Sequence, residues 1–164
     1  LHLDKIEEIL DEELKNAREN SLADEELIVR LLRAQWHYRQ EKALEWRIGR
    51  AGMPEQWTLE SFPFKKQPGV SQKQIRSLAE LDFVARGENL VFIGPTGVGK
   101  TGLASGLLLK ALQNGRRGVF IRAQDLFDEM YASLADRSTR RLLNRLARVD
   151  LLLVDLWYDF SNVE

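Results

Sequence analysis

Hydrophobic residues recur at helical spacing through the N-terminal part of the chain. Leu3, Ile6, Leu10, Leu14 and Ala17 share one face, which predicts an amphipathic helix over residues 2–19. A second stripe predicts a longer helix that ends near Gly49–Pro54, and its members are Leu27, Leu31, Ala34 and Tyr38. Two helices cannot bury their apolar stripes alone, so we expect a small N-terminal helical module over residues 1–52.

Proline and glycine then interrupt the helical pattern. Pro54, Pro63, Pro68 and Gly69 mark residues 53–70 as a linker, and beyond it residues 71–164 alternate between helical and strand patterns. One predicted helix begins at Ser71 and runs through Leu78, Leu81 and Val84 to its end at Gly87, another begins at Lys100, and two more span residues 124–134 and 139–148. The predicted strands are Leu90–Ile93, Gly118–Arg122 and Leu151–Asp155. Strands that alternate with helices are typical of a doubly wound parallel sheet, so the predicted fold class is α/β.

The predicted strand Leu90–Ile93 runs directly into a glycine-rich loop and then a helix. Residues Gly94-Pro95-Thr96-Gly97-Val98-Gly99-Lys100-Thr101 match G-x-x-x-x-G-K-[ST] in the strand–loop–helix context that this phosphate-binding motif requires. Glycines let backbone N–H groups approach phosphate oxygens, and a helix N-terminus favours anions. We expect Lys100 to reach the β- and γ-phosphates and Thr101 to ligate Mg²⁺. The sequence therefore predicts binding of a nucleoside triphosphate, with ATP and Mg²⁺ as cofactors.

A second candidate residue for the same site ends the last predicted strand. Leu151–Val154 are apolar and Asp155 follows them. A buried parallel strand delivers such a carboxylate to the carboxyl edge of the sheet, beside the phosphate loop. We therefore expect Asp155 to hold Mg²⁺ together with Thr101. In the linker, Phe62 and Phe64 are costly residues for a free tether, and we expect them to pack under the domain edge or near the nucleotide base, with plain packing favoured.

Composition limits the other kinds of site. The chain has no cysteine, which excludes disulfides and thiolate metal sites, and His2 and His37 have no further ligand at a useful spacing. Its longest apolar runs, such as Leu151–Val154, are far too short to span a bilayer, and acidic residues interrupt the N-terminus. We expect no membrane association and a cytoplasmic location.

Basic residues gather on the predicted helix over residues 139–148. On a helical wheel with about 100° per residue, the arginines of this helix and Arg137 fall within an arc of roughly 140°, and leucines occupy the opposite side. The five are Arg137, Arg140, Arg141, Arg145 and Arg148. Such a run of charge is usually a solvated face, but the lack of acids among these residues is what contact with a nucleic-acid phosphate backbone requires, so DNA contact is the second interpretation. A weaker candidate is the N-terminal set Arg30, Arg33, Arg39, Lys42, Arg47 and Arg50 with Trp36 and Trp46.

Over residues 1–155 the chain resembles the IstB-like ATP-binding proteins. The resemblance rests on Leu27–Arg39 with Gln35-Trp36-His37-Tyr38-Arg39-Gln40, on Thr58–Phe62, and on Ala85–Leu90 leading into Gly94–Thr101. It implies an AAA+ ATPase core with Gly94–Thr101 as the Walker A loop and Asp155 as the Walker B aspartate. Proteins of this family help the transposase of an insertion sequence to engage target DNA, and they are close relatives of the helicase loader DnaC.

The resemblance implies an ATP-dependent helper in transposition. ATP would bind between adjacent subunits of a homo-oligomer and control its assembly on duplex DNA. One alternative is a helicase loader, which would use the same nucleotide site but dock its N-terminal helices on a hexameric helicase. Another is a P-loop kinase of a small molecule, although nothing in the sequence resembles a pocket for a second substrate.

Two positions depart from the family pattern. The family usually has an acid where Leu156 stands and a histidine or other large residue where Gly102 stands. The acid positions the attacking water in hydrolytic relatives, so we expect this chain to bind ATP but to hydrolyse it weakly or not at all. Residues Leu156–Phe160 resemble the stretch after the family's sensor-one asparagine. We therefore expect the C-terminal part of the core to be missing or discontinuous after Asp155, with no role assigned to Trp157 and Phe160 and with ATP hydrolysis reserved for the complete protein.

Overall fold

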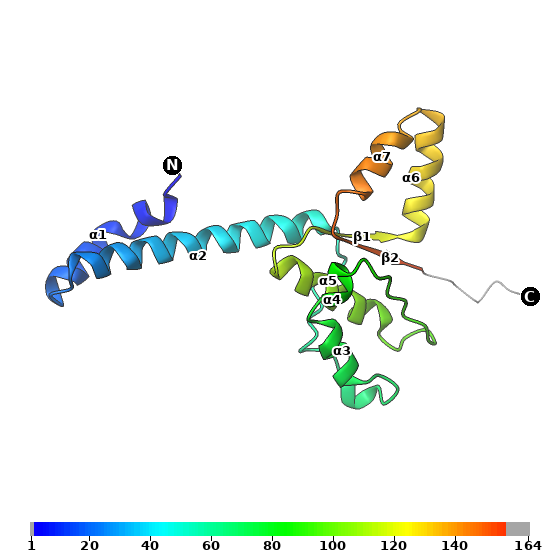
Figure 1. The fold of residues 1–164 in the computed structure, drawn as a ribbon, viewed down its shortest axis with the longest axis horizontal. Coiled ribbons are helices and arrows are strands. Elements are labelled where there is room, and N and C mark those ends of the chain that lie inside the picture. The colour runs from blue at the N-terminus through cyan, green and yellow to red at the C-terminus, as the bar shows by residue number, and fades with distance from the viewer. Residues whose placement is uncertain (1, 157–164) are drawn as a thin grey trace, which may run out of the picture. The chain divides into compact units, whose positions relative to one another are not determined.

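The computed structural model describes residues 2–156 and divides into two compact units, Leu1–Trp46 and Arg47–Glu164. Trp157 and Phe160 lie outside the described residues. The first unit contains α1 (Asp4–Glu19) and most of α2 (Asp24–Ala51). The second contains η1 (Phe64–Lys66), α3 (Gln72–Leu78), α4 (Asp82–Ala85), α5 (Lys100–Gln113), β1 (Gly118–Arg122), α6 (Ala123–Ala135), α7 (Thr139–Leu146) and β2 (Leu151–Asp155) (Figure 1).

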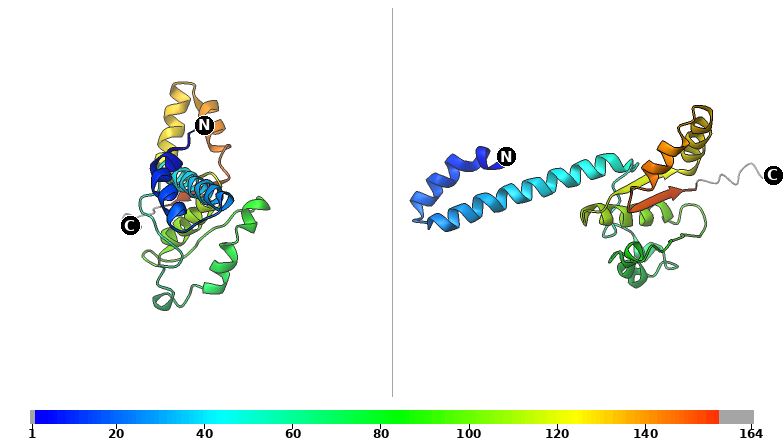
Figure 2. Two further views of the ribbon diagram at one scale, coloured as in Figure 1. Left: turned by 90° about the vertical axis from the view of Figure 1, so that its left-hand side faces the viewer. Right: turned by 45° about the horizontal axis from the view of Figure 1, so that its top comes forward.

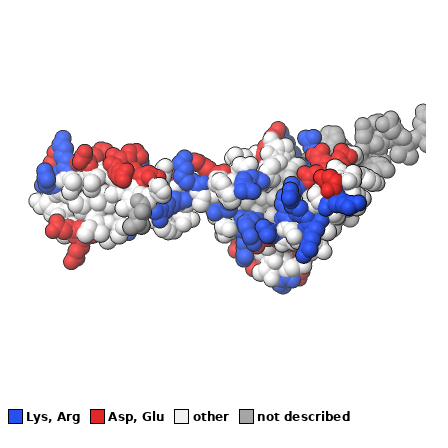
Figure 3. Space-filling model, turned by 90° about the horizontal axis from the view of Figure 1, so that it is seen from above, with Lys and Arg blue, Asp and Glu red and all other residues white. Residues whose placement is uncertain are grey.

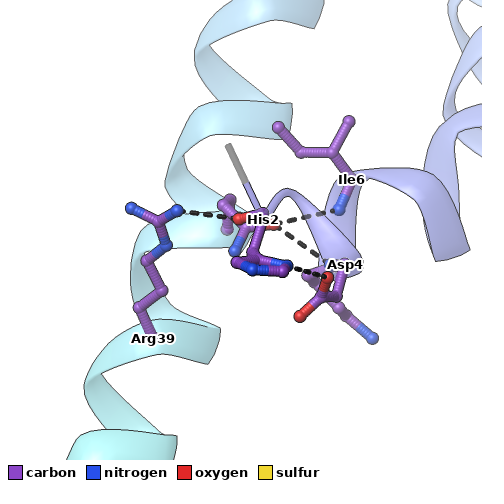
Figure 4. A network of polar contacts seen from close by, with 6 residues as sticks. His2, Asp4, Ile6 and Arg39 are labelled. Carbon is purple, nitrogen blue, oxygen red and sulfur yellow. Dashed lines mark hydrogen bonds and ion pairs between the residues drawn. The ribbon is translucent and has the colours of Figure 1, made fainter.

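The first unit is a hairpin of α1 and α2, as the helical periodicity predicted. Leu3, the N-cap residue of α1, makes no side-chain capping bond. Gln35 of α2 takes that role: its Oε1 accepts hydrogen bonds from the backbone N–H groups of Lys5 at 3.0 Å and Ile6 at 3.2 Å. Nearby, Arg39 Nη2 donates to the backbone oxygen of His2 at 2.7 Å (Figure 4). The start of α1 is therefore held by polar side chains of α2.

The second unit is built on a parallel pair of strands. β1 and β2 pair in register from Gly118 with Leu151 to Arg122 with Asp155. The helix α5 packs against both strands, whereas α6 contacts β1 and α7 contacts α6. In Figure 1 and Figure 2, α5 and the α6–α7 pair lie on opposite sides of the strands. The buried residues of α5 that form the core include Leu103, Leu107, Leu108, Ala111 and Leu112.

The α/β class and the elements around the loop agree with the sequence pattern. The predicted helix after the phosphate loop, both predicted strands after it and both predicted helices between them are present within a residue or two. Ser71 also caps α3, since its Oγ accepts a hydrogen bond from the backbone N–H of Gln74 at 3.3 Å. The helix predicted to run on from Ser71 through Val84 is instead broken. The helix α3 ends at Leu78 with Ala79 as its C-cap residue, and Leu81, the N-cap residue of the short α4, adopts a left-handed conformation with φ 64°.

The prediction of a buried strand over Leu90–Ile93 is wrong for this structure. These residues form no strand, and Val91 and Ile93 are 73% and 92% exposed. A strand needs a neighbour to bond its backbone N–H and C=O groups. Between this segment and β2 lies a cavity of about 510 Å³ rather than a further strand, and among the described residues β2 pairs with β1 alone. An apolar run therefore predicts burial and a strand only where its sheet neighbour is in place.

Candidate functional site

The phosphate loop turns sharply into α5. Gly97 and Gly99 have φ of 82° and 86°, in the left-handed region that L side chains rarely adopt. Gly99 is the N-cap residue, and its carbonyl accepts the first bond of the helix from the backbone N–H of Leu103 at 3.0 Å. The N–H groups in the first turn of a helix have no partners within it, so the start of α5 offers donors and a positive dipole end to an anion.

The side chain of Lys100 folds back against the phosphate loop. Its Nζ donates hydrogen bonds to the backbone oxygens of Gly94 at 2.9 Å and Pro95 at 2.8 Å. The ammonium group is thus placed beside the turn of the loop, where an incoming phosphate would compete with neutral carbonyls for it. A charged acceptor forms the stronger hydrogen bond, so this arrangement suits anion binding.

The structure brings Thr101 and Asp155 together across 54 residues of sequence. Thr101 Oγ1 lies 3.2 Å from Asp155 Oδ1 and 3.3 Å from Asp155 Oδ2. Thr101 sits in the first turn of α5, and Asp155 ends β2 opposite Arg122 of β1. A hydroxyl and a carboxylate are hard oxygen donors, and Mg²⁺ commonly takes only one or two protein ligands beside phosphate and water. The residues present therefore fit the ion that the sequence predicted here.

The cavity next to this pair is mostly apolar. Lys100, Thr101 and Asp155 line it together with Leu90, Phe92, Leu107 and residues 151–154. Leucine and phenylalanine walls do not suit a triphosphate, whereas the lysine, hydroxyl and carboxylate do. Any phosphate chemistry is therefore confined to the part of the cavity at the loop and the end of β2.

Segment 57–62 also contacts this site, and the sequence reasoning missed most of its role. Phe62 is buried in a cluster with Ile75 and Leu103, as plain packing predicted, and it also lies against Gly99. Trp57 lies over Gly102, and Leu59 lies against Gly106. A signal for these contacts was present in the sequence: Gly99, Gly102 and Gly106 share one face of the predicted helix, and glycine within a helix often marks a close approach of another segment.

Arg140, Arg141 and Arg145 lie on α7, whereas Arg137, with φ 60°, precedes that helix and Arg148 follows it. The predicted lack of acidic partners is wrong for one of the five. All five arginines are exposed. Arg145 nevertheless has an acidic partner, because its Nη2 forms an ion pair with Glu129 Oε2 of α6. The hydrogen bonds of Asp136 with Ser138, and the nearby Arg141, lower the pKa of the Asp136 carboxyl group. Figure 3 views the second unit from the side of α6 and α7, where basic side chains gather.

The weaker basic candidate in the N-terminal set is largely engaged within the chain. Arg30 pairs with Glu26, Lys42 with Glu45, and Arg47 Nε donates to the backbone oxygen of Leu112 at 2.9 Å. Within residues 2–156 there is no cluster of three or more His, Cys, Asp or Glu residues that could hold a metal ion. Over the same residues, no helix has both the length and the apolar character needed to cross a membrane.

Comparison with known proteins agrees with these features. The family model for IstB-like ATP-binding proteins matches residues 1–163. The chain is 35% identical over 142 residues to an insertion sequence IS21 putative ATP-binding protein of Pseudomonas aeruginosa, which covers 87% of this chain and 54% of that protein. It is 30% identical over 155 residues to an insertion sequence IS5376 putative ATP-binding protein of Geobacillus stearothermophilus, with coverage of 94% and 62%. The chain thus spans little more than half the length of these relatives.

Proposed function

The chain belongs to the family of IstB-like ATP-binding proteins, and from this we propose that it binds ATP with Mg²⁺ and acts as a DNA-engaging helper of the transposase of an insertion sequence. The observation that carries the nucleotide part is the approach of Thr101 Oγ1 to Asp155 Oδ1 at 3.2 Å, directly beside Lys100 and the glycine loop. Residues that lie 54 positions apart in the sequence thus combine an anion site with oxygen donors for a cation.

Each residue of the site has a distinct part in this proposal. The backbone at Gly97–Lys100 and the Lys100 ammonium group hold the phosphates by charge-assisted hydrogen bonds. Thr101 and Asp155 would hold Mg²⁺, and the ion would neutralise part of the phosphate charge when bound. Leu156, which follows Asp155 and is 73% exposed, supplies no carboxylate to orient water. We therefore assign this chain binding of ATP and negligible hydrolysis.

Two observations support the role in transposition. The relatives named above are ATP-binding proteins of insertion sequences. The exposed arginines of α7 give the second unit a basic surface that suits a phosphate backbone. ATP binding in a homo-oligomer would bring several such surfaces onto one duplex and present them to the transposase.

A helicase loader of the DnaC type is the second candidate. It is favoured by an exposed apolar stripe on α2, where Ile28, Leu32 and Trp36 are 55%, 57% and 57% exposed, since such a stripe suits a protein partner. The two candidates differ in nucleic acid: a helper of transposition should prefer duplex DNA with ATP, and a loader should prefer single strands and capture a helicase through residues 1–50.

Thermal melting with ATP tests the common part of both proposals. At ATP concentrations of about 100 times Kd, linkage predicts stabilisation by about 2.7 kcal/mol and a higher Tm. Lys100→Ala should abolish the ATP-induced shift, whereas Lys110→Ala, at the other end of α5, should retain it. An equal shift in the wild type and Lys100→Ala would refute the assignment of the loop. DNA binding with equal lengths of duplex and single strand then separates the two roles.

A further inference from the structure

Three side chains of one segment lie on three glycines of the nucleotide-binding element. A Cβ at Gly99 would lie 2.6 Å from Phe62 Cε2, and one at Gly106 would lie 2.6 Å from Leu59 Cδ2. A Cβ at Gly102 would lie 3.5 Å from Trp57 Cδ2. We call this segment, Trp57–Phe62, the strap. Because side chains of the strap fill the space above these glycines, it packs directly on the backbone of the phosphate loop and α5.

The path of the chain fixes the strap at both ends. Before it, Arg47 Nε donates to the backbone oxygen of Leu112 near the C-terminus of α5, and Ala51 is fully buried. After it, Phe62 enters the cluster of Ile75 and Leu103. Contacts with this part of the chain therefore run along α5 from its C-terminal carbonyl groups to Gly99, and they are made by Arg47, Leu59, Trp57 and Phe62.

Within the loop, Phe62 contacts the residue that most needs support. Gly99 has φ 86° and is the N-cap residue of α5, so its conformation sets the direction of the N–H groups that would hold phosphate. Glycine populates many backbone conformations. If the glycine loop samples conformations that cannot hold phosphate, the affinity for the nucleotide falls. Phe62 is 7% exposed and its ring closes the space beside Gly99.

We propose that the strap positions the phosphate loop, with Phe62 as the positioning residue that keeps Gly99 in its binding conformation. Phe62 acts through Gly99 and needs no contact with nucleotide. The inference rests on the proposed binding of ATP at Gly94–Thr101 and extends it: affinity for the triphosphate depends on a segment that lies outside the motif.

Nucleotide titration of matched phenylalanine variants tests the proposal. Phe64 is the control, since it packs on Phe62 with ring centroids 4.9 Å apart and belongs to the same cluster, while Phe62 makes the contact with Gly99. Both Phe62→Ala and Phe64→Ala should lower Tm. With a fluorescent ATP analogue and Mg²⁺, at a temperature where both variants are folded, Phe62→Ala should raise Kd about tenfold because the binding-competent loop becomes about tenfold rarer. Phe64→Ala should change Kd by less than about twofold.

A double-mutant cycle tests the strap without removing a core aromatic residue. Alanine forms helices better than glycine, so Gly106→Ala should raise Tm if nothing lay above it. With Leu59 in place, we expect Gly106→Ala to displace the strap, lower Tm and raise Kd. In the Leu59→Ala background both effects should be clearly smaller, because the two nearest atoms that the new methyl group meets belong to the Leu59 side chain and only the backbone N of residue 59, at 3.3 Å, remains.

The outcomes separate this inference from the proposed function. If the wild type binds no nucleotide, the proposed function fails and the strap has no ligand to position. If the wild type binds and Phe62→Ala keeps its Kd, or Phe64→Ala raises Kd as much as Phe62→Ala, the positioning role is overturned while nucleotide binding stands. A Gly106→Ala effect that persists unchanged in the Leu59→Ala background would overturn the contact of the Leu59 side chain with α5.

Discussion

Asp155 owes its place in the site to the register of a strand pair. It ends β2 opposite Arg122, and this position brings its carboxylate to Thr101. Asp155→Asn keeps the shape and one oxygen acceptor but removes the charge that attracts Mg²⁺. We expect ATP affinity measured with Mg²⁺ to fall about tenfold, or about 1.4 kcal/mol, towards the affinity measured with a chelator. Calorimetric titration with and without Mg²⁺ checks this.

The control is Asp125→Asn, an acid in the first turn of α6 rather than beside the loop. This variant should bind ATP with the affinity of the wild type, both with Mg²⁺ and without it. If Asp155→Asn keeps the full gain in affinity from Mg²⁺, the carboxylate does not hold the ion.

Asp150 makes the start of the sheet sensitive to acid. Its Oδ2 accepts a hydrogen bond from the backbone N–H of Arg117 at 2.7 Å, and its own N–H donates to the Arg117 carbonyl at 2.8 Å. The hydrogen bond from the Arg117 backbone, helped by the side chain of Arg117 and the charge of Arg116, lowers the pKa of the Asp150 carboxyl group. A lowered pKa in the folded state means stabilisation that is present above the unfolded pKa of about 3.9 and lost as pH falls through the folded value.

We therefore expect Asp150→Asn to be less stable than the wild type above about pH 5, by at most about 1 kcal/mol because water screens the pair. The difference should shrink as pH falls below about 4. Urea unfolding at several pH values measures it. A difference that is constant from pH 6 to about pH 3 would show that the charge of Asp150 contributes nothing.

Among the elements, α1 depends on α2 for its N-terminal cap. Gln35 Oε1 bonds two N–H groups of α1, and Gln35 is only 5% exposed. Gln35→Leu keeps most of the volume but leaves both N–H groups without this acceptor, so it should destabilise the hairpin by about 1–3 kcal/mol. Gln40→Leu, an exposed glutamine on the same helix, should have little effect. Hydrogen exchange at Lys5 and Ile6 gives the local measurement, and unchanged protection there would contradict the cap.

The basic face of α7 makes a prediction about salt. Arg145 is paired with Glu129, so Arg140, Arg141 and Arg148 are the better test of DNA contact. Replacing these three by alanine should weaken duplex binding for every sequence alike. It should also reduce the slope of log K against log salt by about 2.7, at about 0.9 for each lost phosphate contact. ATP-induced melting shifts should stay unchanged, because the helix does not form the phosphate loop.

The matched control for α7 carries the same loss of charge elsewhere. This control replaces Lys65 and Lys66 of η1 and Arg76 of α3 by alanine, and it also removes three positive charges. If this control lowers the slope as much as the α7 variant, binding reflects net charge and α7 has no special role. If neither changes the slope, α7 is a solvated face.

Local patterns predicted most elements of the second unit, and long-range contacts account for the errors. The helix α5, both strands and the α6–α7 pair follow from periodicity and glycine positions near each element. Leu90–Ile93 was predicted as a strand because its residues are apolar. A strand must pair with a neighbouring strand, however, and the hydrophobic pattern of one segment does not show whether that neighbour is present. Leu81 was assigned to a helix interior, although it takes φ 64° between α3 and α4.

At the scale of the whole molecule, the candidate site also divides into residues that local patterns predicted and residues that only long-range contacts reveal. Gly94–Thr101 could be identified because the motif is contiguous. Asp155 could be identified because the carboxyl ends of parallel strands lie at the same edge of a sheet as the phosphate loop. Gln35 at the start of α1, the strap on its three glycines and the pairing of Arg145 with Glu129 involve residues far apart in sequence. No local spacing gives such contacts, although the glycines of α5 indicated that some segment must approach.

The last prediction concerns how ATP would change the molecule on DNA. The helix α7 has eight residues and is about 12 Å long, so it faces only about seven phosphates of a duplex. With Arg145 paired, the other four arginines, two on α7 and one on either side of it, give one subunit a salt slope of at most about 3.6 and weak binding. If ATP drives assembly, slopes add across subunits, and the slope with a non-hydrolysable ATP analogue should exceed that limit, with affinity rising steeply with protein concentration. Lys100→Ala should retain the low slope under both conditions. A slope that stays below the single-subunit limit with the analogue would mean that ATP does not assemble this chain on DNA.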